Sequence, residues 1–342
     1  MDFGMFTDFH IRTGMTQSEA FDESFAQIAE AENLGIDSVW LAEHHFSPDR
    51  SVLASPMVLS SAIAARTRKI RIGLAVQVLP LTNPLRVAEE AATVDHISKG
   101  RFEFGIGRSG LTKYYQGYNV PYSESRQRFF EALEVIMTAW HEDQFSYQGE
   151  YYSYKDVTVV PKPYQQPYPR TRIAVASEDT FALVGKLGHP IFIGANTPVP
   201  QLQERLLLYR QARKAAGHSG PGAVSLRIPA YVAEDSGRAA SEPEASTMYF
   251  IRYVAQELIK SVASEEGANR LRQMASVPYH EILKDRVMYG PPDAVTDRIY
   301  EYRDQLGISG VVLEMNYGGQ IPNERVLNSV RLLAEKVMPH FK

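Results

Sequence analysis

Apolar and polar positions follow a repeating order along this chain, in which short apolar runs alternate with longer segments that carry apolar residues at helical spacing. The first run covers residues 3–7, and Thr16 to Glu19 then have the spacing of a capping box that opens a helix. Ser55-Pro56 and Asn83-Pro84 each place a capping residue before a first-turn proline. This order predicts strand–helix units in series, which are typical of a parallel sheet covered by helices.

Eight strand–helix units are predicted in all. The predicted strands are 3–7, 38–41, 70–76, 101–106, 172–175, 191–193, 225–233 and 310–315. The predicted helices are 16–34, 56–63, 84–94, 124–141, 179–187, 201–216, 292–306 and 323–338. Eight such units favour a closed, TIM-like (β/α)8 barrel over an open doubly wound sheet.

Two segments interrupt the repeat. Residues 143–160 alternate aromatic and polar side chains and predict a hairpin. Residues 239–289 are polar and helix-prone with one apolar face, and so long an insertion before the last unit predicts a lid. We therefore expect one barrel domain over residues 1–342 with these two insertions.

Composition narrows the class of protein. With 44% hydrophobic and 22% charged residues the chain is an ordinary globular protein, and a net charge of −4 predicts neither nucleic acid nor an anionic membrane as a partner. The absence of cysteine excludes disulfides, thiolate nucleophiles and cysteine-ligated zinc. No secretory signal or membrane-spanning run is evident, so a soluble cytoplasmic protein is expected.

Candidate chemistry gathers where predicted strands end. The apolar run 39–42 leads into Glu43, His44 and His45, and Gly107-Arg108 and Glu314 also fall at the carboxyl ends of strands, where barrel enzymes have their active sites. Histidines also occur as satisfied core residues. A metal site is disfavoured because consecutive strand residues point to opposite faces.

Several segments match one family in the same order over almost the whole chain, and on these the chain resembles the bacterial luciferase family of flavin-dependent monooxygenases, closest to the luciferase α-subunit type. The matching segments are 40–46, 78–80, 83–90, 98–108, 125–126, 175–180, 290–292, Glu314 and 337–339. The resemblance implies a two-component monooxygenase that uses reduced FMN and O2 to oxidise a small organic substrate through a flavin hydroperoxide. It also implies a separate flavin reductase that supplies the reduced FMN.

The resemblance assigns roles to the residues at the strand ends. His44 matches the catalytic histidine of the family, and an imidazole with a near-neutral pKa suits a general base. Glu43 and His45 either orient His44 or hold the end of the strand.

For the phosphate of FMN, the resemblance implies Arg108, Arg126, Ser177 and Thr180. An arginine fork matches phosphate oxygens, and a helix start offers hydroxyls and amides. The alternative for the two arginines is surface ion pairing. Ala176 replaces a phosphate-contacting glutamate of the luciferase α subunit.

Around the flavin ring, the resemblance implies Ala75, Gly107 and Glu314. Ala75 would form a non-proline cis peptide with Val76. Gly107 replaces a reactive cysteine and is expected to leave space beside the ring. Three aromatic residues lie near this strand end, and they either line a substrate pocket or pack within the loop; they are Tyr114, Tyr115 and Tyr118.

A homodimer is expected from the resemblance, packed through the helices at 56–66 and 84–97, which are rich in small residues. Two other readings stay open. One is a deazaflavin-dependent oxidoreductase of the same superfamily, and the other is a flavin-binding relative without catalysis.

Overall fold

A closed ring of parallel strands organises the fold. The computed structural model describes residues 1–260, 262 and 264–342. Following hydrogen-bonded neighbours, the strands of the ring are β1 (Asp2–Thr7), β2 (Ser38–Leu41), β3 (Arg71–Leu74), β5 (Phe102–Gly107), β8 (Arg170–Ala174), β9 (Ile191–Gly194), β10 (Val224–Val232) and β12 (Gly310–Glu314). β9 pairs with β10 and closes the ring, so the predicted TIM-like (β/α)8 barrel is confirmed. Two short strands extend it: β4 (Gln77–Val78) beside β5, and β11 (Met288–Gly290) beside β10.

Helices follow the strands in the predicted order. They are α1 (Gln17–Asn33), α2 (Pro56–Arg66), α3 (Pro84–Ser98), α4 (Thr112–Gly117), α5 (Ser125–His141), α6 (Glu178–Leu187), α7 (Val199–Ala215), α8 (Ser236–Ser241), α9 (Glu244–Ile259), α10 (Glu265–Ala275), α11 (Tyr279–Asp285), α12 (Pro292–Leu306) and α13 (Asn323–Leu332). Thr16 and Glu19 form the predicted capping box of α1, and Asn83 caps α3 through its side chain.

Some predicted boundaries are wrong. The third strand ends at Leu74 rather than at residue 76, and the chain pairs with β5 again only at β4. The short helix α4 is absent from the predicted elements. The last helix ends at Leu332, and the chain continues as a π-helical and a 3-10 turn to Phe341.

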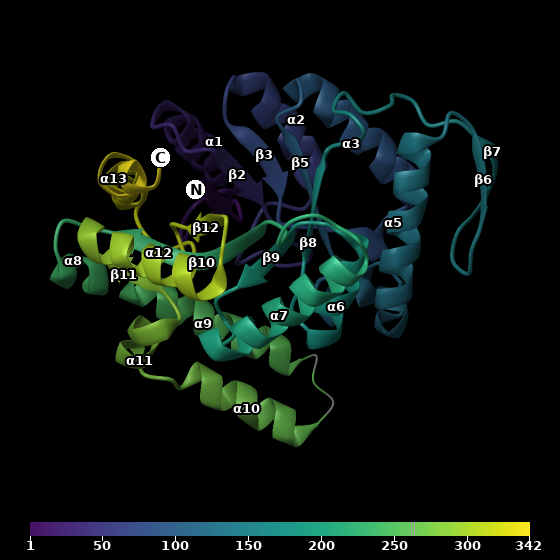
Figure 1. Ribbon diagram of the computed structural model, residues 1–342. Coiled ribbons are helices and arrows are strands. Elements are labelled where there is room, and N and C mark those ends of the chain that lie inside the picture. Colours follow the sequence, from purple (N-terminus) through teal and green to yellow (C-terminus); the bar gives the residue numbers. More distant parts are fainter. Residues whose placement is uncertain (261, 263) are drawn as a thin grey trace. The chain divides into compact units, whose positions relative to one another are not determined.

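The chain divides into two compact units. The second unit, residues 41–46 and 53–174, contains β3, β5 and β8 with α2 to α5. The rings of Phe104 and Trp140 meet edge to face at 5.3 Å in its core. The hairpin β6 (Phe145–Gln148) and β7 (Ser153–Val157) is antiparallel and lies beside α5 (Figure 1).

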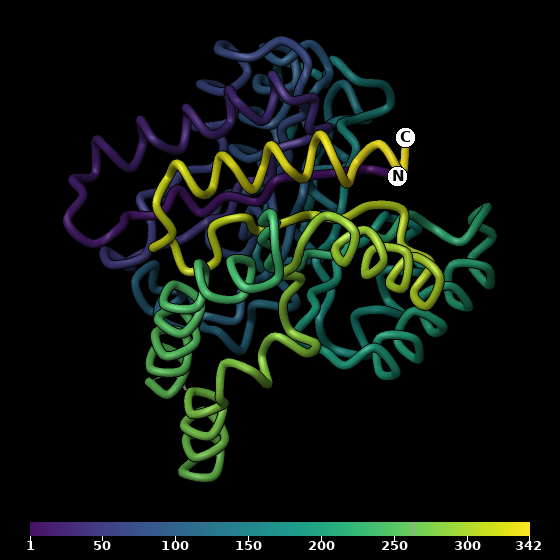
Figure 2. Tube along the Cα trace, turned by 90° about the vertical axis from the view of Figure 1, so that its left-hand side faces the viewer, coloured from purple at the N-terminus to yellow at the C-terminus, as the bar shows by residue number. Residues whose placement is uncertain are grey.

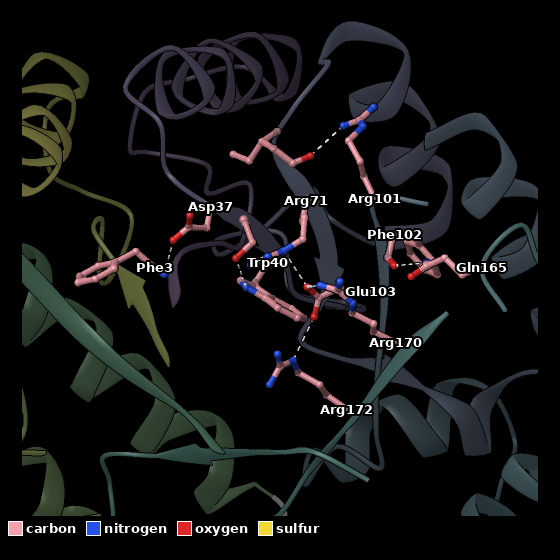
Figure 3. A network of polar contacts seen from close by, with 12 residues as sticks. Phe3, Asp37, Trp40, Arg71, Arg101, Phe102, Glu103, Gln165, Arg170 and Arg172 are labelled. Carbon is pink, nitrogen blue, oxygen red and sulfur yellow. Dashed lines mark hydrogen bonds and ion pairs between the residues drawn. The ribbon is translucent and has the colours of Figure 1, made fainter. Parts of the chain in front are cut away.

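A buried carboxylate ties three strands of the second unit together. Glu103 is almost fully buried, and Arg172 donates to it at 3.1 Å. Arg71 lies 2.9 Å away, in an ion contact whose N–H is not aligned as a hydrogen bond, and Arg170 lies at 4.0 Å (Figure 3). These residues stand near the amino ends of β3, β5 and β8, the side of a barrel that serves stability rather than catalysis.

The first unit, residues 1–40, 47–52 and 175–342, holds both termini, which lie side by side (Figure 2). The Met1 ammonium donates to the carbonyl of Phe341 at 3.0 Å. The segment predicted as a lid forms α9 to α11, and α10 packs against α9. Its last residues belong to β11, which pairs with β10, while residues 261 and 263 lie outside the described part of the chain. A lid role and a single domain over residues 1–342 stay predictions.

Across the described residues, no helix combines the length and the apolar character needed to cross a membrane.

Candidate functional site

Glu43 follows β2 in the second unit and is the centre of a buried hydrogen-bond network. Its Oε1 lies 2.8 Å from Nε2 of His45, and its Oε2 accepts from the Gln77 amide and the Val78 N–H, both at 2.8 Å. Glu43 and His45 share a face because side chains two residues apart in an extended chain point the same way. Glu43 therefore joins the end of β2 to β4 and fixes the ring of His45.

His45 continues this network to the surface. Its Nδ1 lies 3.1 Å from the hydroxyl of Tyr118, a residue that is 45% exposed. If Nε2–H donates to the Glu43 carboxylate, Nδ1 is the acceptor and the phenol of Tyr118 donates to it. Burial, with the Glu43 carboxylate second, raises the pKa of Tyr118, which keeps this phenol protonated.

The imidazole of His44 has a different hydrogen-bond partner from that of His45. Its Nδ1 lies 2.8 Å from the hydroxyl of Tyr114, a fully buried residue of α4, and its backbone N–H donates to the carbonyl of Leu53 at 2.9 Å. The imidazole is thus oriented by a buried phenol that either donates or accepts, so both neutral tautomers are compatible with the contact. The two adjacent histidines therefore have separate partners.

The tyrosines expected near this strand end differ in exposure. Tyr114 and Tyr115 are buried, and their hydroxyls bind His44 and the carbonyl of Arg108, whereas Tyr118 reaches the surface. Its ring lies 5.5 Å from that of Phe46, which is also exposed. A Cβ on Gly117 would lie 2.2 Å from the Phe46 ring, so glycine is needed there for this aromatic edge.

Gly107 does not leave open space. The bond between Ala75 and Val76 is cis, as the resemblance implies. A Cβ placed on Gly107 would lie 2.7 Å from Cγ2 of Val76, so the valine side chain already occupies the volume. The expectation of an enlarged space at Gly107 is wrong for this reason.

Arg108 and Arg126 lie in different elements, but both are close to the start of α5. Arg108 follows β5 and donates through Nη1 to the Ser125 hydroxyl at 3.1 Å, and Arg126 is the next residue of the helix. Within the described residues no carboxylate lies at ion-pair distance from Arg108, so surface ion pairing does not explain it. The Tyr115 hydroxyl donates to the carbonyl of Arg108, and burial raises the pKa of Tyr115. A guanidinium without a carboxylate beside a helix N-terminus suits a phosphate group.

Ser177 and Thr180 lie in the first unit at the start of α6. Ser177 is the N-cap residue, and its hydroxyl lies 2.7 Å from that of Thr180. Arg205 donates to the carbonyl of Ala176 at 2.9 Å, which places another cation beside this helix start. These hydroxyls with a nearby arginine also suit a phosphate, although Glu178 and Asp179 occupy the first turn.

Glu314, at the end of β12 in the first unit, is part of a buried charge cluster. It accepts from Nη2 of Arg227 at 2.6 Å, and fully buried Asp8 pairs with Arg50 at 2.8 Å. Ligand atoms of Asp8, His10 and Glu314 lie within 4.8 Å of one another. Because an arginine already pairs with each carboxylate, the cluster is neutral and suits a metal cation poorly.

The cluster residues other than Glu314 were not predicted. One signal was available, since Arg227 is a single charge inside the apolar run 224–232. Its pairing with Glu314 spans 87 positions and follows only from the alignment of β10 with β12.

Comparison with known proteins identifies the class. The sequence model of the luciferase-like monooxygenase family matches residues 1–309, and the chain belongs to this family. The chain is 29% identical to the uncharacterized protein y4vJ of Sinorhizobium fredii, over 95% of this chain and 93% of that one. With y4wF of the same organism it is 36% identical over 173 residues, and the match spans only half the length of each chain.

A relative with a stated activity is the oxygenase component of the flavin-dependent trigonelline monooxygenase of Acinetobacter baylyi, 26% identical over all of this chain and 96% of that one. Among solved structures, the monooxygenase RslO1 of Streptomyces bottropensis is similar with a TM-score of 0.85 and 28% identity, over 100% of both chains.

Two further structures, each 18% identical, share the fold. The oxygenating constituent of 3,6-diketocamphane monooxygenase of Pseudomonas putida, in complex with FMN, has a TM-score of 0.83 over 99% of this chain and 98% of that one. An F420-dependent secondary alcohol dehydrogenase has a TM-score of 0.78 over 100% of both chains. The chain thus belongs to the luciferase-like monooxygenase family, whose relatives include a flavin-dependent monooxygenase.

Proposed function

We propose that this protein is the oxygenase component of a two-component monooxygenase that uses reduced FMN and O2 to oxidise a small organic substrate. The observation that carries the proposal is Arg108, which follows β5 and whose guanidinium reaches Ser125 at the start of α5 without a carboxylate partner among the described residues. The trigonelline enzyme supports the two-component reaction because it is named as an oxygenase component. The diketocamphane enzyme supports FMN because its structure contains that flavin.

In this proposal Arg108 and Arg126 bind the FMN phosphate, and Ser177 and Thr180 donate to phosphate oxygens from the start of α6. Ala75 and Gly107 lie against the flavin ring through their backbone, and Glu314 contributes to the cofactor site. When bound, reduced FMN supplies the oxygen-transfer chemistry with O2.

His44 acts as the general base, since its imidazole is oriented by Tyr114 and its ordinary pKa is near neutral. Glu43 and His45 are positioning residues. Their mutual hydrogen bond and the contacts of Glu43 with Gln77 and Val78 hold the loop that carries His44.

The proposal includes two protein partners, a flavin reductase and a second copy of this chain. A flavin reductase supplies reduced FMN, and a homodimer forms through α2 and α3. A groove between these helices has a volume of about 230 Å³ and exposes Val58. A cytoplasmic location stays a prediction.

A second candidate is a deazaflavin-dependent oxidoreductase, favoured by the similarity of fold to the F420-dependent alcohol dehydrogenase. A flavin-binding protein without catalysis is the third, and it predicts no product under any condition.

The test compares cofactors that differ by one group. Anaerobic titration with reduced FMN, reduced riboflavin and reduced F420 should give the tightest binding for FMN. Arg108→Ala should lose roughly 10- to 100-fold of the affinity for FMN and almost none for riboflavin, because riboflavin lacks the phosphate. Arg128→Ala is the matched control, since Arg128 lies on the same helix but pairs with Glu124.

Catalysis is tested separately. With a reductase, labelled O2 and a panel of small ketones and aromatic compounds, mass spectrometry should find one labelled oxygen atom in a product. His44→Ala should bind reduced FMN within about threefold of the parent but form at least a hundredfold less product. Tighter binding of F420 than of FMN would reject the proposal, and so would equal product from His44→Ala and the parent.

A further inference from the structure

Arg227 and Glu314 form an ion pair on one face of the strands β10, β12 and β1. Pro229 is level with Glu314, and side chains two residues apart share a face, so Arg227 and Glu314 stand on the same side of the sheet. Met5 is level with Leu313, which puts Phe6 level with Glu314 on the neighbouring strand. The Arg227 guanidinium lies 3.7 Å from the centroid of the Phe6 ring.

This pair keeps unused hydrogen-bonding capacity. Nε of Arg227 and Oε1 of Glu314 are buried, and neither has a hydrogen-bond partner among the residues that the structure describes. Buried polar atoms are costly to leave unpaired and are rare in proteins, so each is an indication of a ligand. Glu314 is only 2% exposed, and its second oxygen is already held by Arg227.

The pair also reaches open space. Every other residue of β10 is buried, but the Arg227 side chain is 35% exposed. The guanidinium therefore has donors that a ligand can approach, while stacking on Phe6 and the bond to Glu314 keep its plane fixed.

Charge decides what kind of ligand fits. Arg227 neutralises Glu314, and Arg50 neutralises Asp8, so the cluster has no net charge to offer an ion. A charged ligand would leave one charge uncompensated in a buried setting, which is expensive. A neutral ligand with an acceptor for Arg227 and a donor for Glu314 satisfies both residues.

Aromatic side chains surround the cluster. Arg50 lies over the ring of Phe250 at 4.9 Å, and Phe250 packs on Tyr317 with ring centroids 4.5 Å apart. Burial, with the Glu314 carboxylate second, raises the pKa of Tyr317, so its phenol stays protonated. The aromatic rings of Phe6, Phe250 and Tyr317 near the cluster favour a planar ligand.

We propose that Arg227 and Glu314 bind the substrate through a neutral planar group in which a hydrogen-bond acceptor adjoins a donor. Amides, lactams and hydroxy-ketones are the chemical class. The carbonyl accepts from the Arg227 guanidinium, and the adjacent N–H or O–H donates to Oε1 of Glu314. The assignment rests on the proposed function, because it names the substrate class of that monooxygenase.

The experiment uses three probes of similar size on the full-length protein. Benzamide has a carbonyl and an adjacent N–H, acetophenone has only the carbonyl, and benzoate is an anion. In ligand-observed NMR titrations benzamide should bind about tenfold more tightly than either of the others.

The variant Arg227→Met/Glu314→Met removes both charges together, so that it leaves no unpaired charge to unfold the protein. It should bind benzamide and acetophenone equally. Arg298→Met/Glu301→Met removes an exposed ion pair of α12 and is the matched control, which should keep the tenfold preference.

Preference for benzoate would overturn the proposal in favour of an anion site. One equivalent of divalent metal retained after dialysis would overturn it in favour of a metal site at Asp8, His10 and Glu314, and absence of binding by any probe at about 10 mM would also reject it. FMN affinity is measured separately. Absence of the benzamide preference in the parent protein, with normal FMN binding, rejects only this inference, whereas absence of FMN binding rejects the proposed function.

Discussion

Restoring a cysteine at position 107 should destabilise this protein through Val76. A Cβ on Gly107 would lie 2.7 Å from Cγ2 of Val76 and 3.4 Å from its Cβ, distances that the structure cannot accept without a shift. Valine is stiff because its side chain branches at Cβ, so it cannot swing its far end away as a lysine would. Gly107→Cys therefore overpacks a site that Val76 already fills.

The expected cost is about 2 kcal/mol, in the range measured for overpacked cores. With an unfolding entropy of roughly 2 cal/mol/K per residue, this chain of 342 residues has about 0.7 kcal/mol/K, so the melting temperature should fall by about 3 °C. Differential scanning fluorimetry of the apoprotein and urea unfolding both measure the change.

Two further variants isolate the contact. Val76→Ala removes the clashing carbons, so the double variant Gly107→Cys/Val76→Ala should be more stable than the sum of the two single changes predicts, by about 1–2 kcal/mol. Gly110→Cys adds the same thiol where a Cβ meets nothing within 4 Å, and it should leave the melting temperature unchanged. Equal melting temperatures for Gly107→Cys and Gly110→Cys, or additive effects in the double variant, would refute the packing argument.

Two other predictions concern stability. Burial, then the charges of His218 and Arg213, lowers the pKa of His189 to about 4. Because the unfolded chain binds this proton below about pH 6.5, lowering the pH from 6.5 to 4 should reduce the free energy of unfolding by roughly 3 kcal/mol more in the parent than in His189→Asn. Urea unfolding at several pH values measures this, and equal pH dependence of the two proteins would contradict it. Glu103→Gln leaves three arginines without their buried carboxylate and should cost about 3–5 kcal/mol in urea unfolding with FMN affinity unchanged; unaltered stability would show that Glu103 is not needed for this charge balance.

The barrel was predictable because its elements are encoded locally. The capping box at Thr16 and the Asn83 cap mark helix starts within a few residues, and both are present. Boundaries failed where a non-local pairing decides them. β3 pairs with the start of β5 and stops at Leu74, and the chain pairs with the end of β5 again only at residues 77–78, a break that no local apolar pattern encodes.

The candidate site was predictable in its residue types but not in its contacts. Strand ends can be read from apolar runs, so the positions of His44, Arg108 and Glu314 at or just after strand ends were predictable. The partners of these residues come from distant segments: Tyr114 lies 70 positions beyond His44, and Arg227 lies 87 positions before Glu314. Side-chain contacts over such separations depend on strand register, which a single sequence does not reveal.

Strand alternation separates the two adjacent histidines into different chemical roles. Glu43 reaches His45 because both side chains leave the same face of an extended segment, and the carboxylate is then shared with Gln77 and Val78. A ring held between a carboxylate and the phenol of Tyr118 has both nitrogens engaged, so removing a proton from substrate would first break that network. Nδ1 of His44 instead lies beside the neutral hydroxyl of Tyr114, so this nitrogen is not hydrogen-bonded to a buried carboxylate. This difference in surroundings favours His44 over its neighbour as the general base.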